Sequence, residues 1–210
     1  MREFFSIILL CVVLGASGCG GEPSGDQSDA GMDLATTQAN SGAPEASEWK
    51  TDEISEAGLT VSYPSAWKRS AEPLMPGLAD PRELVALSTF PFRAGGENCA
   101  HLPENAIEDM GAGDALIVVQ ERVGDLEGSE ATLRDYPERP EHFGPSNGYR
   151  SEAAECLDRR KAFFDRFIPF SESGRRFYAY VAFGADTPSA IRTQTWTILD
   201  RLDVKTAADS

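Results

Sequence analysis

The 210-residue chain lacks an apolar run long enough to cross a membrane as a helix. The longest such run, residues 4–14, would extend about 16 Å as a helix, against a hydrocarbon core of about 30 Å. Histidine and cysteine are also scarce, at two and four residues, and no two of them have the C-x₂₋₄-C or H-x₃₋₅-H spacing of zinc ligands. The sequence therefore predicts no membrane-spanning helix, no metal site and no cofactor.

The chain also has few positively charged residues. Nineteen Lys and Arg residues face 34 Asp and Glu residues, for a net charge of −15. Such a surface repels the phosphates of nucleic acid, which is excluded as a partner. It also repels anionic lipid head groups, so any attachment to a membrane requires acyl chains rather than a basic patch.

The N-terminus has the order of a secretory signal peptide. Arg2 supplies the charge, residues 4–14 the apolar core, and residues 15–18 are small and precede Cys19. The Ala-Ser-Gly-Cys ending resembles the lipobox of bacterial lipoproteins. That resemblance implies cleavage before Cys19, acyl chains such as palmitate on its thiol, and a cell-membrane location facing the extracellular or periplasmic side. The alternative is an ordinary signal peptide that leaves Cys19 a plain thiol.

Composition divides the rest of the chain. Residues 20–48 carry six acids and neither an aromatic nor a basic residue, so they cannot bury enough apolar surface to offset the entropy of ordering. We therefore expect a signal peptide over 1–18, a lipidated cysteine and disordered acidic tether over 19–48, a single domain over 49–205 and a disordered tail over 206–210.

The domain's pattern is mainly that of strands. Apolar alternation or short β-branched runs predict strands over residues 59–63, 84–90, 115–121, 161–170 and 176–183. Pro169 requires an edge strand or a place at the end of a strand, because it cannot donate a ladder hydrogen bond. Helices are expected over 102–111 and after a Thr187 cap. Residues 124–148 are polar and predict a long loop. These elements favour an α+β domain built on one mainly antiparallel sheet with packed helices.

Aromatic residues suggest a candidate ligand surface. Trp67, Tyr178 and Tyr180 could line a pocket, although a second buried sheet face is the better explanation of the two tyrosines. Arg175 and Arg176 could hold an anion or could protect the end of a strand.

A hydrolase site is the weaker alternative. Residues 144–148 read G-P-S-N-G, which matches the G-x-S-x-G motif, but they lack a strand before and a helix after. His101 and His142 both precede Ser146, whereas the histidine follows the serine in that fold. A turn is the better explanation, and no catalytic residue is assigned.

Two cysteines remain for the exported domain, Cys99 and Cys156. Oxidation is favoured outside the cytoplasm, so we predict a disulfide between them. Two buried free thiols or a metal site are the competing interpretations.

Two segments resemble PsbP-like domains: GLTVSYPSAW at 58–67, and FYAYVAFG at 177–184 followed by a helix ending in ILDRL at 198–202. The resemblance implies an antiparallel sheet between helical layers, an α/β/α sandwich, and an accessory or binding role. We therefore expect a membrane-anchored cell-envelope lipoprotein that acts as a non-enzymatic module, with an unknown envelope protein or small ligand as partner. The alternative is an envelope hydrolase whose site is assembled only in the fold.

Overall fold

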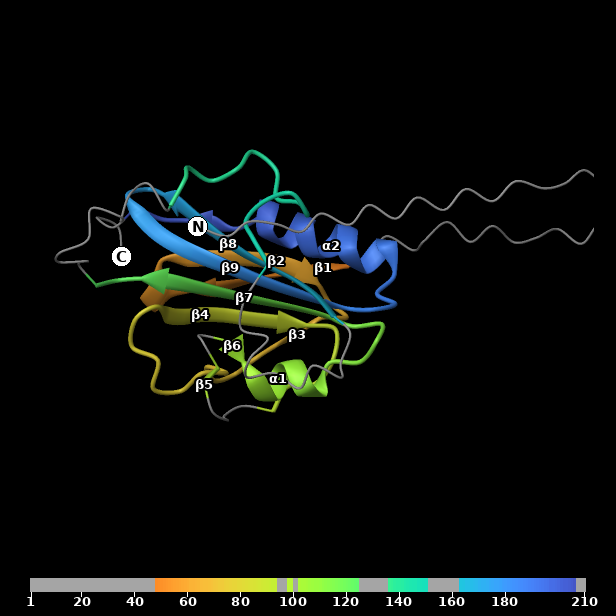
Figure 1. Cartoon of the computed structure of the whole chain (residues 1–210). Helices are drawn as coiled ribbons and strands as arrows, with labels where there is room; N and C mark the ends of the chain where they lie inside the picture. The colour runs from red at the N-terminus through yellow and green to blue at the C-terminus, as the bar shows by residue number, and fades with distance from the viewer. Residues whose placement is uncertain (1–47, 94–97, 100–101, 125–135, 151–162, 207–210) are drawn as a thin grey trace, which may run out of the picture. The chain divides into compact units, whose positions relative to one another are not determined.

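Five antiparallel strands form the main sheet, in the order β3-β4-β7-β9-β8 (Figure 1). The structure is a computed structural model, and it describes residues 48–93, 98–99, 102–124, 136–150 and 163–206. All of these belong to one compact unit. The strands of the main sheet are β3 (Lys68–Arg69), β4 (Arg82–Ser88), β7 (Ala115–Arg122), β8 (Phe163–Glu172) and β9 (Arg175–Gly184).

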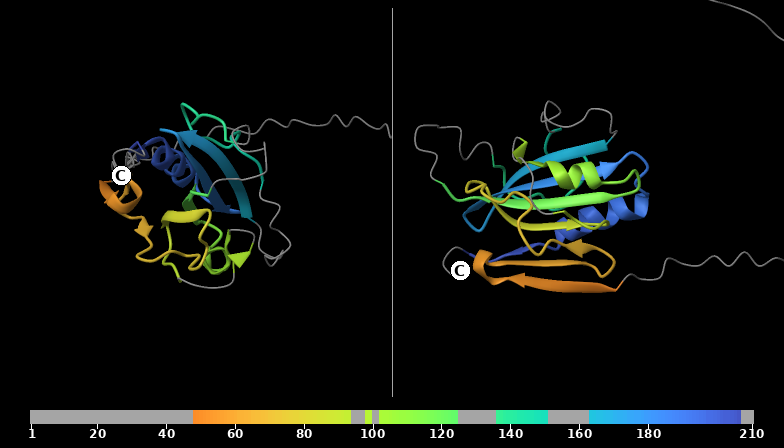
Figure 2. Two further views of the ribbon diagram at one scale, coloured as in Figure 1. Left: turned by 90° about the vertical axis from the view of Figure 1, so that its left-hand side faces the viewer. Right: turned by 90° about the horizontal axis from the view of Figure 1, so that it is seen from below.

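A smaller antiparallel sheet, in the order β1-β2-β10, packs beside the main one (Figure 2). Its strands are β1 (Trp49–Ile54), β2 (Leu59–Pro64) and β10 (Asp203–Val204), and a 3-10 turn over Ser55–Ala57 joins the first two. Helix α2 (Ser189–Asp200) contacts β2, β7 and β9. The remaining elements are α1 (Glu104–Asp109) and the short paired strands β5 (Asn98–Cys99) and β6 (Leu102–Pro103).

The two faces of the main sheet bury separate apolar clusters, because side chains alternate along a strand. On one face, Phe177, Ala179, Val181 and Phe183 of β9 pack with β2 and α2. On the other face, Tyr180 and Ala182 pack with α1 and with Leu74 and Met75, which lie in the loop between β3 and β4. Strand β7 is covered on both sides, as its continuous apolar run predicts. The α+β class with a mainly antiparallel sheet is confirmed.

The edge strand β8 is protected by residues 136–150. Phe167 exchanges two backbone hydrogen bonds with Tyr149, of 2.8 and 3.0 Å, and Ser171 N donates to Pro137 O at 2.7 Å. Pro169 lies between these contacts and offers no N–H, so its predicted edge position is confirmed. Gly148 permits the approach: its φ is 68°, and a Cβ there would lie 2.2 Å from Phe167 O. These contacts leave little of this edge open to another strand.

Helix α2 begins one residue later than its sequence pattern suggests. Pro188 occupies the N-cap position and makes no side-chain cap. The Thr187 hydroxyl donates instead to the carbonyls of Asp114 and Gly184, at 2.6 and 2.9 Å. The predicted Thr187 cap is therefore wrong, because the hydroxyl is used to fasten the β9–α2 turn to the start of β7.

Candidate functional site

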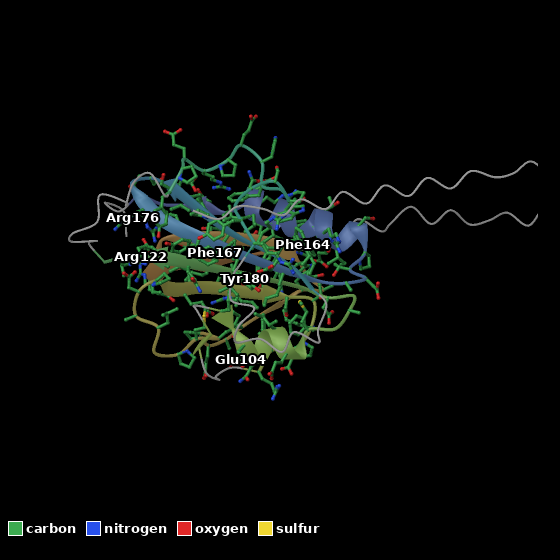
Figure 3. The ribbon with its side chains drawn as sticks, in the orientation of Figure 1. Glu104, Arg122, Phe164, Phe167, Arg176 and Tyr180 are labelled. Atoms are coloured by element: carbon green, nitrogen blue, oxygen red, sulfur yellow. The ribbon has the colours of Figure 1, made fainter. Side chains whose placement is uncertain are left out.

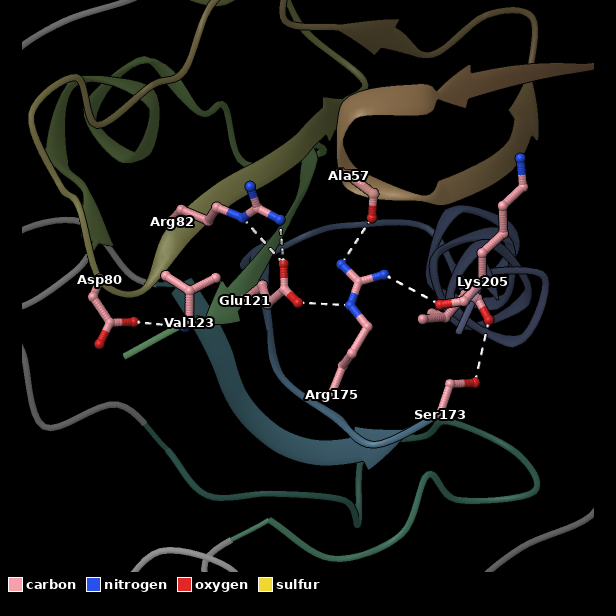
Figure 4. A network of polar contacts seen from close by, with 9 residues as sticks. Ala57, Asp80, Arg82, Glu121, Val123, Ser173, Arg175 and Lys205 are labelled. Carbon is pink, nitrogen blue, oxygen red and sulfur yellow. Dashed lines mark hydrogen bonds and ion pairs between the residues drawn. The ribbon is translucent and has the colours of Figure 1, made fainter. Parts of the chain in front are cut away.

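A buried ion network closes one end of the main sheet (Figure 4). Arg175 Nε donates to Glu121 Oε1 at 2.6 Å, and each side chain is only 7% exposed. Arg82 donates to Glu121 Oε2 through Nε and Nη2, at 3.1 and 2.8 Å. Arg175 also donates to Ala57 O at 2.8 Å and to Lys205 O at 3.4 Å. Burial would raise the pKa of Glu121, but the two guanidinium groups outweigh it and hold that pKa below its ordinary value.

The network has a structural role, because Arg175 of the main sheet is hydrogen-bonded to the carbonyls of Ala57 and Lys205, which lie next to strands of the smaller sheet. Each of its three guanidinium nitrogens already donates a hydrogen bond within the protein and the side chain is buried, so Arg175 is unsuited to the anion binding considered for it. Arg176, the next residue, points to the opposite face of the sheet because of strand alternation. It donates to Gly124 O at 2.8 Å.

Arg139 fastens the protecting loop to the end of α2. Its guanidinium donates to the carbonyls of Leu199, Asp200 and Leu202, at 2.7–2.9 Å, and to Glu172 at 2.8 Å. These carbonyls include ones that a helix C-terminus leaves without partners, and a cation is favoured there. No local sequence pattern indicates this role, because Arg139 lies in a polar loop far from α2 in the sequence.

An open cleft of about 720 Å³ lies beside the β8–β9 turn. It is lined by Glu138, Arg139 and residues 171–176. Two of its arginines are already paired, Arg139 with Glu172 and Arg175 with Glu121. Within the described part of the chain, Glu138 and Arg176 are the charged lining residues for which no ion pair is formed.

An aromatic cluster lies on the face of the sheet that carries Tyr180 (Figure 3). The rings of Phe167 and Tyr178 have centroids 4.5 Å apart, and those of Tyr136 and Tyr178 are 4.9 Å apart. The hydroxyls of Tyr136 and Tyr178 are hydrogen-bonded to each other. Tyr149 stands 5.7 Å from Phe167 and is 55% exposed. Phe167 and Tyr178 are half-buried, so this face is both aromatic and accessible.

Two arginines border this cluster. Arg122 of β7 and Arg176 of β9 are directly opposite each other in the strand register, on the same face as Tyr178. Arg122 Nε lies 3.1 Å from Asp80 Oδ2. Asp80 Oδ1 in turn accepts a hydrogen bond from Val123 N at 3.0 Å. Figure 3 shows Arg122 and Arg176 at the same end of the sheet.

The structure does not bring Trp67, Tyr178 and Tyr180 together. Trp67 is 1% exposed, packs in the cluster beneath α2 and donates to Gln194 Oε1 at 3.1 Å. Tyr178 and Tyr180 lie on the opposite face of the sheet, where Tyr180 is fully buried. Trp67 lies in the turn between β2 and β3, and its side chain packs in the cluster on the α2 side of the main sheet. Of the three, Tyr178 alone is accessible.

Tyr180 is a buried phenol whose hydroxyl has no hydrogen-bond partner in the described structure. Burial, with the charge of Asp165, raises the pKa of this group well above its ordinary value.

A Tyr180→Phe variant should be as stable as the unmodified protein, or more stable by up to about 1 kcal/mol, because an unsatisfied buried hydroxyl is removed without loss of a bond. Urea denaturation measures the difference. A loss above about 1 kcal/mol would show that the hydroxyl has a partner in solution.

Glu83 is a carboxyl group whose pKa is displaced by burial. Leu74 N donates to both of its oxygens at 3.0 Å, and Met75 N donates to Oε2 at 3.3 Å. Burial raises the pKa of Glu83 to about 7, although these two N–H groups act in the opposite direction. The carboxyl group thereby holds the 70–81 loop against the sheet.

The displaced pKa of Glu83 predicts a pH dependence of stability. The folded-state pKa of about 7 lies above the ordinary value of 4.5, so the folded protein binds a proton that the unfolded chain has released. The contribution of Glu83 is fully present below pH 4.5 and is lost as the pH rises through 7. Denaturant titrations across this range should show the unfolding free energy of the unmodified protein falling relative to Glu83→Gln. Parallel pH profiles would contradict the assignment.

The groups considered for hydrolysis are not assembled among the described residues. Ser146 is exposed in a turn closed by Asn147, and no hydrogen bond joins it to His142. The His142 side chain is 80% exposed and lies 3.4 Å from Asp200. Within the ranges that the structure describes, no three His, Cys, Asp or Glu residues are grouped as metal ligands.

The cysteine predictions fall largely outside the described residues. Cys19 and Cys156 are not described, nor is His101, and for Cys99 only the backbone in β5 is described. Lipidation at Cys19 and the Cys99–Cys156 disulfide therefore stay predictions, as does the 19–48 tether.

Comparison with known proteins adds no family assignment. No protein-family model matches the chain, and no curated protein matches it. None of the helices in the described ranges has the length and apolar character needed to cross a bilayer.

Proposed function

We propose that this protein is a cell-envelope lipoprotein, anchored in the membrane through Cys19, that acts as a non-enzymatic binding or accessory module. The order of charge, apolar run, small residues and cysteine at the N-terminus supports the anchor. The acidic segment 19–48 would act as a tether between the membrane and the domain. The partner is an envelope protein or a small ligand.

The proposal of a non-enzymatic role rests on one observation: the carboxylates that lie near other charged side chains are bound by arginines with a structural role. Glu121 and Glu172 lie where charged side chains gather, and each is bound by an arginine that also holds backbone carbonyls of another element. A general base needs a lone pair directed at its substrate. The lone pairs of these two carboxylates are directed at structural partners instead. The cleft beside them is open to solvent, which suits the docking of a partner better than a reaction that must exclude water.

We also propose that the domain is a PsbP-like α/β/α sandwich. A PsbP-like sandwich has an antiparallel sheet between helical layers. Helices α1 and α2 on opposite faces of the main sheet are consistent with that arrangement. The resemblance favours an accessory role, although likeness of fold alone is a weak guide to function.

A serine-directed fluorophosphonate probe separates this proposal from a hydrolase that uses Ser146 as its nucleophile. The purified full-length chain should show no more labelling than its Ser146→Ala variant, with an established serine hydrolase as positive control. Labelling that is lost in Ser146→Ala would contradict the proposal and would assign the G-P-S-N-G turn to a nucleophile.

A further inference from the structure

The opposed arginines Arg122 and Arg176 form an unbalanced charge pair. Like charges directly opposite each other in an antiparallel sheet are destabilising. Among the residues described, Asp80 is the carboxylate that pairs with Arg122, whereas Arg176 donates to the neutral carbonyl of Gly124. Within the ranges that the structure describes, these two positive charges therefore share one negative charge, in a chain whose net charge is −15.

The adjoining part of the same face is aromatic. Tyr178 is two residues from Arg176 on β9, which places the two side chains next to each other along the strand. Phe167 packs against Tyr178 from β8. The Tyr178 hydroxyl is taken by Tyr136, so Tyr178 offers a ligand its ring rather than a hydrogen bond. Both rings are half-buried, so each keeps some solvent-exposed surface.

We propose that Arg122, Arg176, Phe167 and Tyr178 bind a small organic anion, a carboxylate attached to an aromatic ring. A guanidinium group binds a carboxylate through two parallel hydrogen bonds. The rings of Phe167 and Tyr178 then contact the aromatic body in offset or edge-to-face geometry. Arg176 also lies at the border of the open cleft beside the β8–β9 turn, whereas Arg122, Phe167 and Tyr178 do not line that cleft. The acidic remainder of the surface disfavours polyanions.

This inference rests on the proposed binding role and names the ligand class. It is tested with three probes on the full-length chain in mild detergent: phenylacetate, the uncharged phenylacetamide, and acetate, which lacks the ring. Ligand-observed NMR gives the dissociation constants, with empty micelles subtracted. Phenylacetate should bind at least tenfold more tightly than either of the others.

Matched arginine variants locate the site. Arg176→Gln should weaken phenylacetate binding at least tenfold. Arg166→Gln should leave it within twofold, because Arg166 points to the other face of the sheet and lies 4.3 Å from the Phe164 ring centroid. Phe167→Leu removes one ring without touching the charges and should also weaken binding. Thermal unfolding checks that each variant is folded; Arg122→Gln takes the place of Arg176→Gln if that variant is not.

Equal binding of phenylacetate and phenylacetamide would overturn the inference, as would equal losses in Arg176→Gln and Arg166→Gln. Absence of phenylacetate binding would overturn it as well. The proposed function would then remain open to its own test, since the fluorophosphonate result depends on Ser146 and not on this face.

Discussion

Arg175→Met is expected to lower the free energy of unfolding by about 3 kcal/mol or more. The substitution leaves the Glu121 carboxylate buried with Arg82 as its remaining cation, and Arg82 is itself 42% exposed. It also leaves the carbonyls of Ala57 and Lys205 without their donor, which loosens the smaller sheet from the main one. Urea denaturation followed by tryptophan fluorescence measures the change.

A second ion pair of the same length serves as the control. Arg93 and Asp109 are also 2.6 Å apart, but Arg93 is 63% exposed. Arg93→Met should change the free energy of unfolding far less than Arg175→Met, because exposed ion pairs contribute little. Similar losses in Arg93→Met and Arg175→Met would show that burial does not set the strength of the Arg175 network.

Ile198→Ala is expected to lower the free energy of unfolding by about 2–5 kcal/mol. Ile198 is fully buried where α2 meets β2 and the main sheet, so truncation leaves a cavity between the layers. Thr193→Ala, on the exposed side of the same helix, should change stability by no more than about 0.5 kcal/mol. If Ile198→Ala also falls within that limit, α2 is not docked on the sheet as the structure has it.

Local periodicity was enough to predict the longer strands of the main sheet, strand β2 and the two helices. The alternation of residues 177–183 identifies β9 and assigns its two faces correctly, and Pro169 identifies β8 as an edge strand. Side chains alternate between the two faces of any strand, so a short stretch of sequence is enough to reveal which residues share a face. Periodicity did not reveal the second, three-stranded sheet, because β1 is mostly polar and β10 is only two residues long.

The polar contacts could not be predicted in this way. Arg175 and Glu121 lie 54 positions apart, and nothing in either strand distinguishes a buried ion pair from two solvated charges. Trp67 was grouped with Tyr178 and Tyr180 because all three are aromatic, whereas the layer to which each belongs depends on tertiary packing. The opposed Arg122 and Arg176 required the register of β7 and β9, which the sequence leaves open.

Intact-mass measurement of the protein from bacterial membranes tests the membrane anchor most directly. The account predicts a chain that begins at Cys19 and carries a diacylglycerol group on its thiol. A Cys19→Ala form should be released from the membrane or remain unprocessed. A mature chain with an unmodified Cys19, or a Cys19→Ala form that fractionates and is processed like the unmodified protein, would contradict the account.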